Sequence, residues 1–226
     1  MLNPAFVQTL ALSLLVMVFS LTVHEFAHAL VAKRLGDDTA ERQGRLSLSP
    51  VTHVDPVGTL LVPALSLYFG GIGFIGWARP VPVSPARFTR KVTMRTGMAL
   101  VAVAGPLSNL LLAVLSLAVY AIGDHTGTLL RDASGQLSAV GVLLVHMFRL
   151  NVALAIFNLL PIPPLDGSRL LPRSFDGLLE RIAPVSFVLL LALINAPQIR
   201  FYIFDAPYGL VAGALEAVFR TQVVFR

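Results

Sequence analysis

The sequence has 226 residues, of which 56% are hydrophobic and only 13% are charged, and its mean hydropathy is +0.79. A water-soluble domain usually has about a quarter of its residues charged, so this composition excludes an ordinary soluble protein and predicts an integral membrane protein. The net charge of +5 fits the basic cytoplasmic loops of such a protein, and we expect no nucleic-acid partner. The absence of cysteine excludes disulfides and thiolate metal sites.

The first predicted element is a membrane-spanning helix over about residues 5–32. Crossing the hydrocarbon core takes roughly 20 apolar residues, and the first 23 residues carry no charge. A cleavable signal peptide is not expected, because the segment lacks a basic start and cleavage at its end would destroy the motif described next. We therefore predict that this helix spans the membrane, with the N-terminus outside.

His24, Glu25 and His28 form a His-Glu-x-x-His signature inside this first span. Residues four apart lie on one face of a helix, so the two imidazoles can bind one zinc ion, with Glu25 as a general base. Such a short pattern also occurs by chance. Ionisable residues within a span, however, cost about 2.5–3.5 kcal/mol each on insertion scales and are functional by default. The motif therefore predicts a zinc site in the membrane.

The next apolar stretch, residues 57–78, is predicted to re-enter the membrane rather than to cross it. Its length suits a span, but Pro63 and a glycine-rich second half disfavour a continuous helix. Nine lysines and arginines lie in the flanking segments 33–56 and 78–96. A full crossing would put these basic segments on opposite faces, against the positive-inside rule. A re-entrant segment keeps them all on the cytoplasmic side.

Residues 71–83, GIGFIGWARPVPV, are predicted to be extended rather than helical. Pro80 and Pro82 restrict the residues before them to extended geometry, and prolines confine a strand to the edge of a sheet. This β-like element on the cytoplasmic side would receive an unwound substrate chain by strand addition. The alternative is a loop that only plugs the re-entrant segment.

Two further spans are predicted over about 97–122 and 138–160. The C-terminal part, 183–220, is apolar but interrupted by prolines and charged residues, so it supplies two shorter spans or one span plus an interfacial helix. The predicted fold class is an all-α membrane protein, a polytopic bundle of about five to six transmembrane segments with the re-entrant element on the cytoplasmic side. We expect a single domain over 1–226, with its catalytic core over about 5–170.

The positions of the cations set the expected orientation of this multi-pass protein in the cell membrane. Segments 33–96 and 161–182 are predicted to lie inside. Segment 123–137, which has Arg131 as its single lysine or arginine, is predicted to lie outside. The active site would then lie near the cytoplasmic side of the membrane.

A catalytic zinc site typically has three protein ligands and one open position, so the histidine pair needs a third ligand. His146 lies near the middle of its helix, which is too deep, and His125 falls in the outer loop. Asp166 follows the cytoplasmic end of the 138–160 helix, at the depth and on the side of the histidine pair, so topology favours it. The alternative is that Asp166 and the following glycine only form a turn after a proline-broken helix.

Three motifs in this order resemble the site-2 protease family of intramembrane zinc metalloproteases: HEFAH on the first span, AGPLSN at 104–109 and NLLPIPPLDG at 158–167. The resemblance implies that His24, His28 and Asp166 bind one zinc ion and that Glu25 is the catalytic base. It implies a transmembrane protein or peptide substrate in the lipid bilayer, cleaved within or near its membrane segment in regulated intramembrane proteolysis. The chain is similar to the short members without PDZ or CBS domains, and its oligomeric state is not predicted.

Three further residues are candidates for the site. By the resemblance, Asn158 and Asn109 hold the substrate backbone or polarise its carbonyl group. The alternative for each is a hydrogen bond to a neighbouring helix, worth around 0.6–2 kcal/mol in a membrane, and this is the interpretation preferred for Asn151. His53 is either an exposed loop residue or a residue at the mouth of the site, where a neutral imidazole can fill the fourth zinc position at rest.

Two functions other than proteolysis are also compatible with these residues. A metal-ion transporter or binding protein also has histidines and acids within the membrane, but its ligands are expected on several helices at the midplane, often with symmetry between halves. Glu25 would have no evident task in it. A non-catalytic membrane scaffold has no use for three ligands beside a general base, so the enzyme is preferred.

Overall fold

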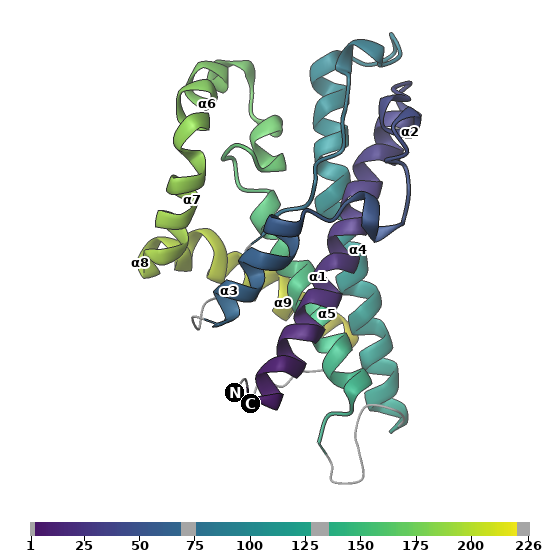
Figure 1. Cartoon of the computed structure of the whole chain (residues 1–226), viewed down its shortest axis with the longest axis vertical. Helices are drawn as coiled ribbons and strands as arrows, with labels where there is room; N and C mark the ends of the chain where they lie inside the picture. Colours follow the sequence, from purple (N-terminus) through teal and green to yellow (C-terminus); the bar gives the residue numbers. More distant parts are fainter. Residues whose placement is uncertain (1–2, 69–75, 128–135, 221–226) are drawn as a thin grey trace.

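The computed structural model describes residues 3–68, 76–127 and 136–220, and the regular elements in these residues are helices (Figure 1). Three described helices are long and apolar enough to cross a membrane: α1 (Pro4–Arg34), α4 (Met94–Thr126) and α5 (Ala139–Asn158). They correspond to the three clear spans predicted from the sequence. The shorter helices are α2 (Thr39–Arg42), α3 (Val62–Tyr68), α6 (Asp176–Ile182), α7 (Ser186–Asn195), α8 (Pro197–Arg200) and α9 (Ala206–Phe219).

The ends of the long helices carry recognisable capping signals. The Thr93 side chain accepts a hydrogen bond from a backbone N–H in the first turn of α4, and the Ser138 side chain does the same for α5. Helix α4 ends at Gly127, whose φ of 66° is a left-handed conformation that favours glycine. Helix α1 ends with Lys33 and Arg34 in its last turn, where cations stabilise the helix dipole.

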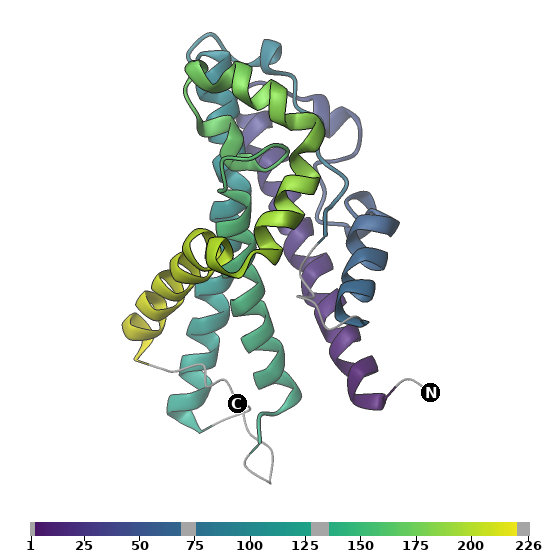
Figure 2. The same ribbon diagram turned by 90° about the vertical axis from the view of Figure 1, so that its left-hand side faces the viewer.

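Helix α4 packs against both α1 and α5 (Figures 1 and 2). Its buried face repeats every four residues and is made mostly of small side chains: Gly97, Val101, Gly105, Asn109 and Ala113. Lipid tails are as apolar as a protein core, so helices associate in a membrane through close packing and hydrogen bonds, which small residues permit. Phe148 of α5 is buried against this helix together with Ala113 and Leu117.

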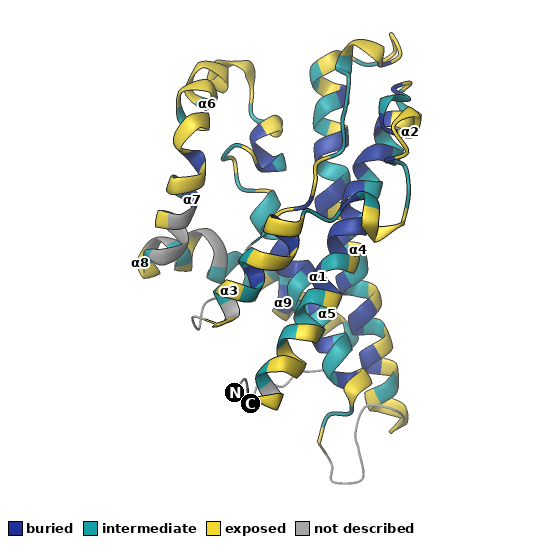
Figure 3. Cartoon of the chain, in the orientation of Figure 1, coloured by how far each residue is buried: buried dark blue, intermediate teal, exposed yellow. Residues whose placement is uncertain are grey.

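The opposite face of α4 is apolar and exposed. Its exposed large side chains are Leu100, Leu107, Leu111, Leu115, Val119 and Ile122. They follow one another at helical spacing, and Figure 3 shows exposed positions alternating with buried ones along the long helices. A continuous apolar stripe on the outside of a helix indicates that lipid, rather than water, surrounds it. The chain is therefore a membrane protein.

The connecting segments are sorted between the two ends of the bundle. The end of α1, α2, the start of α4 and α6 lie at one end, whereas the end of α4 and the start of α5 lie at the other (Figure 1). The segments predicted on the cytoplasmic side, 33–56, 78–96 and 161–182, are therefore grouped at one end, opposite the loop between α4 and α5.

The stretch 56–84 leaves the bundle and returns to it. A π-helical turn, Pro56–Leu61, continues into α3, which lies beside α1. The Trp77 N–H then donates to Gly58 O at 3.2 Å, and the Thr59 hydroxyl donates to Trp77 O at 2.8 Å. Gly58 and Thr59 therefore lie side by side with Trp77. Pro63, which lacks an N–H, follows directly after the change from π-helical to α-helical hydrogen bonding between Leu61 and Val62.

The predicted β-like element is only partly within the described residues. Residues 71–75 of the predicted extended segment 71–83 lie outside them. Residues 76–84 have neither helical nor strand structure, so no strand is formed in this part. The two prolines explain this, because Pro80 and Pro82 have no N–H to donate to a neighbouring strand.

The C-terminal part contains shorter helices than the prediction assumed. Helix α7 has 10 residues and α9 has 14, which at ~1.5 Å per residue span about 15 and 21 Å. A membrane crossing needs ~30 Å. Pro197 and Pro207 interrupt the apolar run. The described residues therefore contain three helices of membrane-spanning length, fewer than the five to six segments predicted.

Candidate active site

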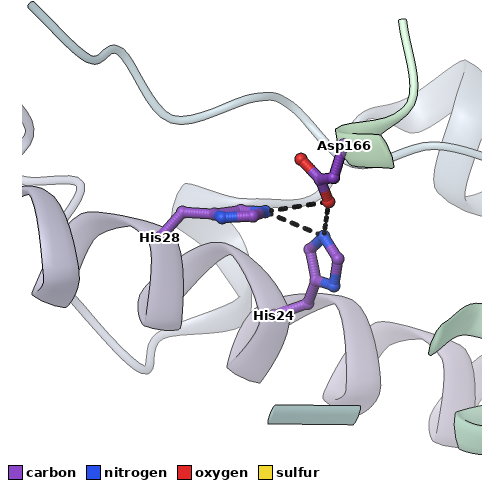
Figure 4. Close-up of side chains that lie close together, drawn as sticks. All are labelled: His24, His28 and Asp166. Atoms are coloured by element: carbon purple, nitrogen blue, oxygen red, sulfur yellow. Dashed lines mark hydrogen bonds and ion pairs between the residues drawn. The ribbon is translucent and has the colours of Figure 1, made fainter. Parts of the chain in front are cut away.

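Three side chains meet where α1 faces the loop after α5 (Figure 4). His24 and His28 lie one turn apart on α1, and their Nε2 atoms are 3.0 Å from each other. Asp166 begins a 3₁₀ turn, Asp166–Leu170, and its Oδ2 lies 3.2 Å from Nε2 of His24 and 3.3 Å from Nε2 of His28. The structure thus brings together the three residues predicted as metal ligands.

The loop that carries Asp166 folds back onto the end of α5. Leu165 N–H donates to Ile162 O, and Ser168 N–H donates to Leu165 O. A Cβ atom at Gly167 would lie only 2.1 Å from Leu159 O, so only glycine permits this close approach of the two backbones. The proline-rich break after α5 therefore returns Asp166 to α1.

The outer nitrogen of each imidazole is held by the protein. The Nδ1 of His24 lies 2.7 Å from Asn109 Oδ1, and the Nδ1 of His28 lies 2.7 Å from Val101 O. Both partners are oxygen acceptors, so each Nδ1 carries the proton and donates it. Each Nε2 then presents a lone pair towards Asp166, which is the tautomer that a metal ligand needs.

This donor set fits a zinc ion. Two nitrogen lone pairs and one carboxylate oxygen converge without a proton between them, and Oδ2 of Asp166 has no hydrogen-bond partner in the described part of the chain. Three electron-pair donors within 4.8 Å repel one another unless a cation lies between them. Two imidazoles and a carboxylate are typical zinc ligands.

Behind His24, a network of buried polar side chains joins the three long helices. The Nδ2 of Asn109 donates to Asn151 Oδ1 at 2.8 Å, and the Nδ2 of Asn151 donates to Ser20 Oγ at 2.9 Å. Both asparagines are fully buried. Asn109, predicted to bind substrate, is fully buried, and its Oδ1 accepts from the outer nitrogen of His24. Ser20, which the sequence reasoning missed, lies one turn before His24 on the same face.

A cavity of about 270 Å³ opens next to the histidine pair. Its walls come from α1, the segment 76–83, the end of α5 and the Asp166 turn. Glu25 and Asn158 both contribute to the lining. The amide nitrogen of Asn158 donates to Leu154 O at 3.0 Å, and this leaves a second N–H and the amide oxygen for other partners. Asn158 thus lies on the wall of the cavity beside the histidine pair.

Glu25 is held by the backbone of the segment 76–84. The Val81 N–H donates to Glu25 Oε2 at 2.9 Å. The carboxylate is 8% exposed and lies on the cavity wall. This hydrogen bond occupies one oxygen of Glu25. Sequence reasoning missed the contact, because the two residues are 56 positions apart.

His53 lies elsewhere than either interpretation of the sequence predicted. Its side chain is 1% exposed, so it is not an exposed loop residue. The Nε2 lies 2.8 Å from Ser47 O, and the ring is not part of the cavity wall. His146, set aside as too deep, is bonded within its own helix to Val142 O.

Comparison with known proteins agrees with this arrangement. The model of peptidase family M50 matches residues 12–196. The chain is 38% identical over 189 residues to a Bacillus subtilis protein named "Putative zinc metalloprotease YwhC", covering 80% of this chain and 78% of that protein. It is 32% identical over 195 residues to "Putative zinc metalloprotease Rip2" of Mycolicibacterium smegmatis, covering 84% and 69%.

The Mycobacterium tuberculosis H37Rv protein of the same name is 35% identical over 195 residues, covering 84% of this chain and 69% of that protein. No solved structure matches the chain. The family match extends over most of the chain and includes the His-Glu-x-x-His helix, the AGPLSN motif and Asp166. The chain therefore belongs to peptidase family M50, the site-2 protease family, and is a zinc metalloprotease.

Proposed function

We propose that this protein is an intramembrane endopeptidase that hydrolyses peptide bonds within or near transmembrane segments of other membrane proteins. We assign His24, His28 and Asp166 as the ligands of one zinc ion and Glu25 as the catalytic base. One observation carries the proposal: two Nε2 atoms and a carboxylate oxygen converge within 3.3 Å on a helix that is itself long and apolar enough to span a membrane. The whole chain, 1–226, is proposed to form one domain.

The chemistry follows from how the chain holds its own groups. When bound, zinc supplies a Lewis acid that makes water nucleophilic near neutral pH and polarises a carbonyl group. The Val81 N–H donates to Oε2 of Glu25, and we assign Oε1 to accept the proton of the attacking water. This carboxylate takes the proton from the attacking water and returns it to the leaving amine. The fixed imidazole tautomers keep both Nε2 lone pairs turned towards the reaction centre.

The cavity suits an unwound peptide more than an intact helix. Its volume of about 270 Å³ is at the small end of ligand pockets, which range over roughly 300–1,000 Å³. A substrate helix must therefore unwind before its scissile carbonyl reaches the site. Asn158, on the cavity wall, is proposed to hold the substrate backbone, and the segment 76–83 is proposed to lie along the substrate.

The proposed position in the membrane is near the cytoplasmic side, with the stretch 56–84 re-entrant. Gly58 and Trp77 are joined by a hydrogen bond, whereas the ends of a crossing segment would be about 30 Å apart. Glycines permit this meeting, since a Cβ at Gly76 would lie 2.3 Å from Gly58 O. The basic segments on either side support the cytoplasmic assignment.

The test is cleavage of a model transmembrane peptide by the purified protein in lipid vesicles, compared with its Glu25→Gln variant. General base catalysis contributes roughly 10²–10⁴-fold, so the variant should lose cleavage by at least that factor. It should keep its zinc, because Glu25 is not among the proposed ligands. Cleavage at the wild-type rate by Glu25→Gln would reject the proposed mechanism.

The same vesicles separate the enzyme from a metal transporter. A transporter would carry zinc across the bilayer and lose this flux on His24→Ala, without any peptide hydrolysis. Zinc flux without cleavage in the wild-type protein would favour that alternative.

A further inference from the structure

Arg45 lies in the loop after α2 and reaches the segment that holds the catalytic base. Its Nη2 donates to Arg79 O at 2.5 Å and to Pro80 O at 3.3 Å. The side chain is only 9% exposed, and its Nε has no hydrogen-bond partner among the described residues. Burying a guanidinium costs free energy unless the group is well paired. The position of Arg45 against two backbone carbonyls therefore suggests that it has a task there.

The carbonyl of Pro80 and the N–H of Val81 belong to one planar peptide unit. Arg45 contacts the oxygen of this unit, and Glu25 Oε2 accepts from its N–H at 2.9 Å. Because the unit is rigid, rotating its oxygen away from Arg45 would also turn its N–H away from Glu25. A cation on the oxygen also polarises the amide and strengthens donation from the N–H.

Within residues 80–82, no other backbone N–H can replace that of Val81 as the donor to Glu25. Pro80 and Pro82 have no N–H, so Val81 supplies the only backbone N–H from residue 80 to residue 82. The chain just before this peptide is also held, because the Arg79 N–H donates to His53 O at 2.8 Å.

We propose that Arg45 is a positioning residue for catalysis, which acts through the Pro80–Val81 peptide to hold Glu25 at the angle needed to accept the proton of the attacking water. The inference rests on the proposed function, in which Glu25 is the base. Arg45 itself does not touch the substrate or the proposed zinc ligands. Burial and the nearby Arg79 lower the pKa of Arg45 while Glu25 raises it, which agrees with its position between the two.

The test is a double-mutant cycle on the full-length protein in lipid vesicles, with a model transmembrane peptide as substrate. Arg45→Ala removes the cation. Val81→Pro removes the N–H at a residue that already precedes a proline and is therefore already restricted to extended geometry. The matched control is Arg42→Ala, because Arg42 is an exposed arginine three residues earlier that pairs with Asp38.

Each single variant should lower kcat by about ten- to a hundredfold, the range expected from misplacing a catalytic group by ~1 Å. Zinc content should change little in both variants, because no proposed ligand is removed. KM should change little in Arg45→Ala, because Arg45 is not part of the cavity wall, whereas Val81 is. The double variant should be no slower than the worse single variant, because Arg45 acts through the Val81 N–H. Arg45→Lys should recover part of kcat, and Arg42→Ala should match the wild type.

Other outcomes would overturn the inference. Additive losses in the double variant, zinc loss in Arg45→Ala, or full activity in either single variant would show that Arg45 does not act on the base in this way. Faster cleavage would show that the contact restrains the enzyme instead. Should Arg45→Ala fail to fold, Arg45→Lys combined with Val81→Pro gives the same cycle. If Glu25→Gln itself retains cleavage, the proposed function fails whatever the arginine variants do.

Discussion

Gly105 is the residue at which helix packing and the metal site meet. It lies on the buried face of α4, directly against the two histidines of α1. A Cβ atom there would lie 2.5 Å from His24 Cε1 and 2.5 Å from His28 Nε2. Carbon atoms do not approach a neighbouring group this closely, so any side chain at this position must displace an imidazole.

We predict that Gly105→Ala loses most of its zinc and therefore its activity, measured as metal content and cleavage rate of the purified variant. The matched control is Gly213→Ala on α9, where a Cβ would meet nothing within 4 Å and alanine favours a helix by roughly 1 kcal/mol over glycine. That variant should retain zinc. Normal zinc content in Gly105→Ala would mean that the two histidines are not held as described.

The sequence predicts the individual site residues well where the spacing is local. His24 and His28 share a helix face because they are four residues apart, and the topology of the spans was enough to bring Asp166 to the same end of the bundle. The contact of Asn109 with His24 and that of Glu25 with Val81 could not be predicted from the sequence, because each joins positions at least 56 residues apart. Such contacts depend on how the helices pack, and spacing along the chain does not encode that.

At the scale of elements, the stretch 56–84 differs most from what its composition predicts. Pro63 and the glycines were taken only to disfavour a continuous helix over residues 57–78, and the structure describes residues 56–68 as helical. The glycines serve a close approach instead, since a Cβ at Gly58 would lie 2.4 Å from the Trp77 ring. Local propensity thus did not predict the helical conformation of the first part of this stretch.

The re-entrant arrangement predicts which face of the membrane exposes each flank. Gln43→Cys and Ala86→Cys, both at exposed positions in a chain without cysteine, should react with a membrane-impermeant maleimide only from the cytoplasmic side. The control, His125→Cys at the far end of α4, should react only from the opposite side. Labelling of positions 43 and 86 from different faces would show that the stretch between them crosses the membrane.

At the scale of the whole molecule, the active-site proposal depends on three long helices and one returning loop. Helix α1 supplies both imidazoles, α4 fixes their outer nitrogens, and the loop after α5 supplies Asp166. The polar network from Asn109 to Ser20 ties these helices together where lipid offers no other partner. The same packing that builds the bundle therefore also builds the site.

The most direct measurement is zinc content combined with X-ray absorption at the zinc edge, on the wild-type protein and two variants. We predict one zinc ion per chain, with two imidazole nitrogens at ~2.0–2.1 Å and carboxylate oxygen among its ligands. Asp166→Ala should lose most of the zinc, whereas His53→Ala, whose ring lies outside the cavity wall, should keep it. Full zinc in Asp166→Ala together with an empty site in His53→Ala would contradict the proposed ligand set.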